Sequence, residues 1–137
     1  MTPNEILKQV FEYFMAPEHW SDGYDAKDWT GENDNIIGSV TRSGGSEDLF
    51  LKLKNASWAT CHCWQGAIYK FAPTLELAEA TLLHAATLVP EVKHPDGEPP
   101  HTGYGDDLHE ASNRIIHFND ANGHEAVLTV LEKAIAA

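Results

Sequence analysis

The sequence predicts a mainly α-helical domain of the α+β class, with about five helices and one inserted β-hairpin. Three observations predict this architecture. Apolar residues recur at the spacing of one helix face in several segments, Thr and Pro residues stand where those segments should start and end, and one Gly-rich link joins two β-prone runs. The chain has 137 residues, of which 42% are hydrophobic, so we expect one domain over residues 1–137 with a buried core.

The first predicted helix spans residues 3–16. Thr2 can cap it, Pro3 suits its first position, and Glu5 stands three residues after the cap, where it completes a capping box. Apolar residues then follow at helical spacing until Pro17, which cannot continue the helix.

The β-hairpin is predicted as an insertion at about residues 35–57. Two β-prone runs, 35–42 and 49–54, flank a Gly-rich link of a length that favours a hairpin. Leu49, Leu51 and Leu53 alternate with other residues, so one side of the second run would be apolar. We expect that side to pack on helices, because an isolated two-stranded ribbon is marginally stable in water.

Three further helices are predicted in the middle of the chain. Thr60 can cap a helix that continues through Phe71, and Thr74 can cap another that ends before Pro90. A short helix is expected over residues 107–118, after a stretch rich in Pro and Gly that predicts an exposed loop.

The last helix is predicted to follow a turn over residues 119–123. Asn122 and Glu125 match a second capping box, and apolar residues at helical spacing follow it. This helix completes the five that we expect.

The charge balance is strongly acidic. Nine Lys and Arg stand against 21 Asp and Glu, which gives a formal net charge of -12. This balance disfavours direct nucleic-acid binding, which needs a basic surface. The acids concentrate in residues 1–35 and 91–110. We therefore predict an acidic face that contacts a protein partner with a basic surface. The predicted partner-binding residues are Asp106, Asp107 and Glu110. The alternative is that the charge only keeps the protein soluble.

The sequence contains no signal that predicts export or membrane insertion. No cationic start precedes an apolar run, and no stretch of about 20 apolar residues could span a bilayer. The two cysteines, Cys61 and Cys63, lie too close together for the long-loop disulfides of small secreted domains. We expect a cytoplasmic protein without membrane contact.

Several short motifs in a fixed order resemble a known family. They are the Trp20-x-x-Gly23 segment, the Cys63-x-x-Gly66-Ala67 helix and the Asn119-Asp120 turn ahead of the final helix. In this order and spacing the chain resembles a small bacterial and bacteriophage family of unknown function. The chain departs from that pattern at residues 35–57 and at Gly123-His124. The resemblance implies no activity, and it makes a bacteriophage origin plausible.

Cys61-His62-Cys63 is the most chemically suggestive triplet. Thiolates at a helix N-terminus have lowered pKa values and can act as nucleophiles or metal ligands. If these residues are helical, the two thiols lie about 200° apart around the axis and cannot share one ion. A free cysteine is among the most buried residue types, so we interpret both cysteines as core residues, with thiol chemistry as the alternative.

The eight histidines and one Asn-Asp pair complete the candidates for chemistry. His94, His101, His109 and His117 offer metal ligands, but no His-x-x-x-His or His-Glu-x-x-His spacing occurs. Asn119-Asp120 suggests an oriented carboxylate, although bonding to backbone groups explains it more simply. We therefore predict no catalytic residue, no metal site and no cofactor.

The preferred functional hypothesis is an acidic, cytoplasmic, non-enzymatic binding protein that is phage-encoded and inhibits a host nucleic-acid-binding protein by occupying its basic cleft. One alternative is a small metal- or thiol-dependent enzyme that uses the His-rich loop or Cys61 and Cys63. Another is a structural or assembly component that works through self-association. The sequence leaves the identity of the partner and the oligomeric state open.

Overall fold

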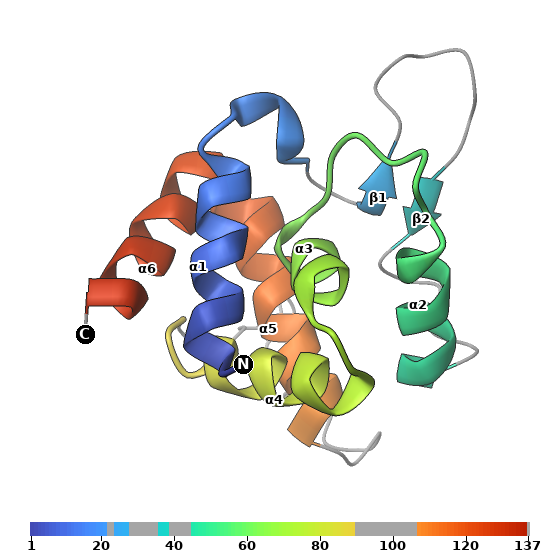
Figure 1. The fold of residues 1–137 in the computed structure, drawn as a ribbon. Coiled ribbons are helices and arrows are strands. Elements are labelled where there is room, and N and C mark those ends of the chain that lie inside the picture. Colours follow the sequence, from blue (N-terminus) through green and yellow to red (C-terminus); the bar gives the residue numbers. More distant parts are fainter. Residues whose placement is uncertain (22–23, 28–35, 39–44, 90–106, 137) are drawn as a thin grey trace, which may run out of the picture.

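The computed structural model describes residues 1–21, 24–27, 36–38, 45–89 and 107–136. Within these ranges the chain forms six α-helices, one short 3-10 helix and two short strands. The helix α3 (Trp64–Phe71) lies in the middle of the structure (Figure 1). Four helices pack around it: α1 (Pro3–Phe14), α2 (Gly45–Lys54), α4 (Leu75–Ala86) and α5 (Asp107–Asn122). The last helix, α6 (His124–Ala136), packs on α1 on the side away from α2 (Figure 1). The helical character expected from the sequence is confirmed.

The predicted start of the first helix is confirmed in detail. Thr2 Oγ1 accepts a hydrogen bond from the backbone N–H of Glu5, and the Glu5 carboxylate accepts one from the backbone N–H of Thr2. Pro3 occupies the first turn, and the apolar face of α1 is buried. The helix ends at Phe14, two residues before the predicted end, and the 3-10 helix η1 (Pro17–His19) follows.

The predicted architecture of five helices with a β-hairpin over residues 35–57 is wrong. Residues 45–54 form α2, so the run 49–54 is helical. The alternation that suggested a strand does not match the burial, because Leu53 is 4% exposed whereas Leu51 is 52% exposed. Residues three apart, such as Phe50 and Leu53, lie on one face of a helix, and both contribute to the core.

The strands that the structure contains pair differently from the predicted hairpin. Strand β2 (Ile36–Gly38) pairs in antiparallel register with β1 (Tyr24–Lys27), which precedes it in the chain. Ala26 pairs with Ile37, and the side chain of Ala26 is fully buried against the helical core. The short sheet therefore lies beside the helices as an edge element (Figure 1).

Thr74 caps α4 as predicted, because its side chain accepts from the backbone N–H of Leu77 at 3.2 Å. The helix expected from Thr60 begins later. Its N-cap is Cys63, whose sulfur accepts from the backbone N–H of Gly66 at 3.5 Å.

The junction between the last two helices also differs from the prediction. α5 continues through Asn122, so Asn119 and Asp120 lie inside a helix and not in a turn. The expected capping box is not the start of α6, because Gly123, with φ +88°, separates the two helices and its carbonyl accepts from Val127. Glycine reaches this φ without strain, so one residue is enough to reverse the chain direction.

Candidate functional site

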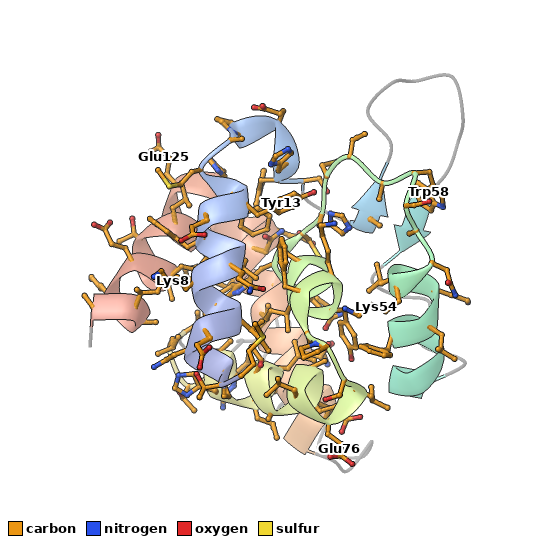
Figure 2. All side chains as sticks on the ribbon, viewed as in Figure 1. Lys8, Tyr13, Lys54, Trp58, Glu76 and Glu125 are labelled. Carbon is orange, nitrogen blue, oxygen red and sulfur yellow. The ribbon has the colours of Figure 1, made fainter. Side chains whose placement is uncertain are left out.

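A cluster of aromatic and imidazole rings surrounds Tyr13 near the C-terminal end of α1 (Figure 2). The His19 ring stacks on the Tyr13 ring with centroids 4.2 Å apart, and the Phe71 ring meets it edge-on at 5.4 Å. The Tyr13 hydroxyl lies 2.9 Å from Nδ1 of His62, which is 1% exposed. We call Tyr13, His19, His62 and Phe71 the Tyr13 cluster.

The environment of the Tyr13 cluster keeps its buried groups neutral. The pKa of His62 is lowered from 6.5 to about 3. Burial is the largest cause, and the electrostatic effects of Lys70 and His19 add to it. Burial, followed by the nearby Cys61, raises the pKa of Tyr13 to about 12. A neutral imidazole and a neutral phenol at this distance form a structural hydrogen bond. Neither has a pKa close to neutrality, which a general acid or base would use.

His19 and His124 both bond to carbonyl groups at the end of α1. His19 Nδ1 lies 2.8 Å from the carbonyl oxygen of Tyr13, and His124 Nε2 lies 2.6 Å from that of Phe14. The last carbonyl groups of a helix have no partner within the helix, so these two rings satisfy groups that would otherwise need water. Their role here is to tie η1 and α6 to α1.

The Cys61-His62-Cys63 segment is extended and not helical. His62 forms a parallel bridge with Trp20, and its backbone N–H donates to the carbonyl of His19 at 2.8 Å. The argument that the two thiols lie about 200° apart therefore does not apply. Their interpretation as core residues is confirmed, because Cys61 is 0% exposed and Cys63 2% exposed. The two cysteines are not joined in a disulfide.

Asn119 joins three parts of the chain from a fully buried position in α5. Its side-chain oxygen accepts from the indole N–H of Trp20 at 2.8 Å and from the backbone N–H of Trp64 at 3.1 Å. Its amide donates to the carbonyl of Ser21 at 3.2 Å. The structural interpretation of Asn119 is confirmed, although its partners lie far away in the sequence. Asp120, the next residue of α5, accepts a hydrogen bond from the Asn119 amide at 3.0 Å.

The predicted partner-binding residues can be placed only by backbone. Asp107 is the first residue of α5 and Glu110 lies in its first turn, while Asp106 lies outside the described residues. Acidic side chains in a first helical turn are favoured by the helix dipole, which accounts for part of this acidic segment.

The four candidate histidine ligands cannot be compared as a set. His94 and His101 lie outside the described residues, His109 lies in α5 with only its backbone described, and His117 is exposed on α5. Among the described residues no group of three or more His, Cys, Asp or Glu side chains could hold a metal ion. No helix in the same ranges has the length and apolar character needed to cross a membrane.

Sequence reasoning missed a second surface, next to the Tyr13 cluster. Lys54 of α2 donates to the carbonyl of Lys70 at 2.8 Å and lies 5.4 Å from the Phe50 ring centroid. The Lys70 ammonium lies 5.6 Å from the ring of Tyr13 and 5.5 Å from that of Phe71. We call these five residues the lysine–aromatic surface. Residues 49–75 contain no Asp or Glu, and this signal in an acidic chain could have revealed it.

The comparisons with known proteins give one match. The model of a protein family described as "Family of unknown function (DUF6197)" matches residues 1–137. No curated protein and no solved structure matches the chain.

Proposed function

The chain belongs to the DUF6197 family, whose description assigns no activity, and we propose that it is a binding protein that engages a basic protein partner through its acidic face. The observation that carries the proposal is the concentration of charge. Residues 91–110 hold six acids against Lys93 alone, in a chain of net charge -12. Such a surface attracts and orients a basic partner over several ångströms and disfavours acidic ones.

The internal polar groups support a binding role over a catalytic one. His62 bonds to Tyr13, Cys63 caps α3, and Asn119 holds Trp20, Ser21 and α3 together. These side chains are the types that catalysis would use, and each is engaged in holding the fold. We propose that the acidic side chains are the groups that contact the basic partner.

A nucleic-acid-binding protein of the host cell is the partner that we propose. Such proteins present the basic clefts that phosphates occupy, and an anionic protein surface can occupy the same cleft. The resemblance to bacteriophage proteins supports this form of the proposal, in which a phage-encoded chain acts in the host cytoplasm.

The test is capture from a bacterial lysate on the immobilised full chain, followed by mass spectrometry. The variant reverses the charge of Asp106, Asp107 and Glu110 to Lys. The control reverses Glu76, Glu125 and Glu132, which are exposed and include two residues in the first turns of α4 and α6. Both variants change the net charge equally and both lose favourable helix-dipole contacts.

We expect the wild type and the control to retain the same basic proteins, and the variant to lose them. Raising the salt from low to physiological concentration should weaken their retention steeply, because the screening length falls to about 8 Å. Equal retention by all three proteins, or retention indifferent to salt, contradicts the proposal.

A further inference from the structure

The lysine–aromatic surface presents two positive charges beside apolar rings. Lys54 and Lys70 are both exposed, and neither forms an ion pair with another described residue. Phe50, Tyr13 and Phe71 are half-buried, and a lysine ammonium lies 5.4 to 5.6 Å from the ring centroid of each. Such a surface combines charge with an apolar contact area, which is the composition of a binding site for an acidic segment.

The electrostatics of this surface favour an incoming carboxylate. Burial, followed by the charge of Lys70, lowers the pKa of Lys54, so the two ammonium groups repel each other. The segment 49–75, which supplies four of the five residues of this surface, contains no acid. A carboxylate placed between the two ammonium groups would replace this repulsion with two attractions, and the partial burial of Lys54 would strengthen the attraction at Lys54.

We infer that the lysine–aromatic surface docks the acidic start of α5 from a second copy of this chain. The chain itself supplies the complementary charge, because Asp107 and Glu110 lie within an acid-rich run that has one lysine. The two surfaces differ, so the contact is head-to-tail and one chain can receive and donate at once. The inference rests on the proposed function, because the same acidic face would also bind the basic partner.

The net charge of the chain does not prevent this association at physiological salt. Charges separated by more than about 8 Å are largely screened under these conditions, so the local contact dominates over the repulsion between whole molecules. At low salt the long-range repulsion of two chains of charge -12 grows. At high salt the local attraction is screened as well, so association should be strongest at intermediate salt.

The experiment is sedimentation equilibrium of the full chain over a range of protein and salt concentrations. One variant carries Lys54→Glu and Lys70→Glu, and a second carries Asp107→Lys and Glu110→Lys. The control for the first variant carries Lys8→Glu and Lys133→Glu, two exposed lysines on α1 and α6 that give the same change of net charge as Lys54→Glu with Lys70→Glu. Lys70→Gln alone is included because, among the described residues, the Lys70 side chain contacts only the rings of Tyr13 and Phe71, so we expect the fold to tolerate its loss.

We expect the wild type and the control to associate, and each charge-reversal variant alone to associate roughly 10-fold or more weakly. Lys70→Gln should weaken association in the same direction. An equimolar mixture of the two variants should restore association, because the reversed surfaces are again complementary. A wild type that stays monomeric, or variants whose mixture does not associate, overturns the inference.

The two proposals fail in different ways. If the wild type is monomeric but loses its basic partners on reversal of Asp106, Asp107 and Glu110, only the inference fails. If the variant with Asp107→Lys and Glu110→Lys keeps its basic partners and also its self-association, the proposed function and the inference both fail. A monomeric chain that captures an acidic lysate protein, and no longer captures it when the charges of Lys54 and Lys70 are reversed, also overturns the inference. Such a result assigns the lysine–aromatic surface to another partner.

Discussion

The side-chain oxygen of Asn119 accepts a hydrogen bond of 2.8 Å from the indole N–H of Trp20, which lies 99 residues earlier in the chain. The same oxygen accepts from the first backbone N–H of α3, and the amide of Asn119 donates to Ser21. One buried side chain therefore fixes α5, the start of α3 and the segment after η1 relative to one another. Moving or replacing this side chain is costly, because each broken hydrogen bond leaves a buried polar group without a partner.

Replacement of Asn119 by Ala should lower the free energy of unfolding by about 3 kcal/mol. The change leaves the indole N–H of Trp20, the backbone N–H of Trp64 and the carbonyl of Ser21 without this partner. Urea unfolding followed by tryptophan fluorescence measures the effect. Asn122→Ala is the control, because Asn122 is exposed at the end of the same helix and should change stability by less than about 0.5 kcal/mol. Equal effects of the two changes would show that Asn119 does not organise the fold.

His62 should make the stability depend on pH in acid. Its pKa lies at about 3 in the folded chain and at 6.5 in the unfolded chain, so below 6.5 the unfolded state binds a proton that the folded state does not. Its contribution is therefore fully present above pH 6.5 and is lost as the pH falls toward 3, by at most about 1.4 kcal/mol per pH unit. Urea unfolding at about pH 7.5, 6 and 5 measures the slope of the free energy of unfolding against pH.

Below pH 6.5 the free energy of unfolding should depend less steeply on pH in His62→Gln than in the wild type, by up to about 1.4 kcal/mol per pH unit, which corresponds to one proton. Glutamine does not titrate, and it can still bond to the Tyr13 hydroxyl. All other side chains are the same in both proteins, so the difference between the two slopes isolates His62. Identical slopes for both proteins would mean that His62 is protonated in the folded chain near pH 6.

Tyr13→Phe should remove the hydrogen bond to His62 and lower the free energy of unfolding by about 1 to 2 kcal/mol. The ring contacts to His19 and Phe71 need no hydroxyl and should survive. Titration of the tyrosine absorbance gives a second measurement. In the wild type Tyr13 should ionise only at about pH 12, and the absorbance change in that range should be smaller by one tyrosine in Tyr13→Phe. An unchanged titration curve would show that Tyr13 is not the shifted group.

Local signals in the sequence predicted the parts of the fold that short-range contacts determine. Thr2 and Thr74 cap their helices as expected, because an N-cap bond joins residues only three apart. The prediction of a strand over residues 49–54 is wrong because leucine at alternate positions fits a strand and also leaves Leu53 on the buried face of a helix. The contacts of α2 with α3 and α4 decide between the two, and those contacts are not local.

The candidate site could be predicted only in part for the same reason. Burial of Cys63 follows from its residue type, but its role as the N-cap of α3 depends on an extended segment paired with Trp20. Tyr13, Lys54 and Lys70 come from three helices and share no motif. Their juxtaposition arises from packing around α3, and the sequence shows only its indirect sign, the absence of acids between residues 49 and 75.

Both thiols should react slowly with a thiol reagent in the folded protein and rapidly in denaturant. Burial blocks access to Cys61 and Cys63, which are 0% and 2% exposed. Cys63→Ser should keep the cap of α3, because serine is a preferred N-cap residue, whereas Cys63→Ala should lose about 1 kcal/mol of stability. Rapid labelling of either thiol in the folded chain, with loss of partner binding in a folded Cys63→Ala variant, would favour thiol chemistry instead.

Gly123→Ala should destabilise the junction of α5 and α6 by about 1 to 2 kcal/mol. Gly123 has φ +88°, a region that L side chains rarely adopt, and an added Cβ there would meet no atom within 4 Å. The cost is therefore conformational and not steric crowding by neighbours. Gly123→Asn should cost less, because asparagine tolerates the left-handed region better than alanine does. Thermal unfolding of the three proteins should rank them in the order glycine, asparagine, alanine. An alanine variant as stable as the wild type would mean that the junction can take up a different backbone conformation, and that α6 does not depend on this turn for its position against α1.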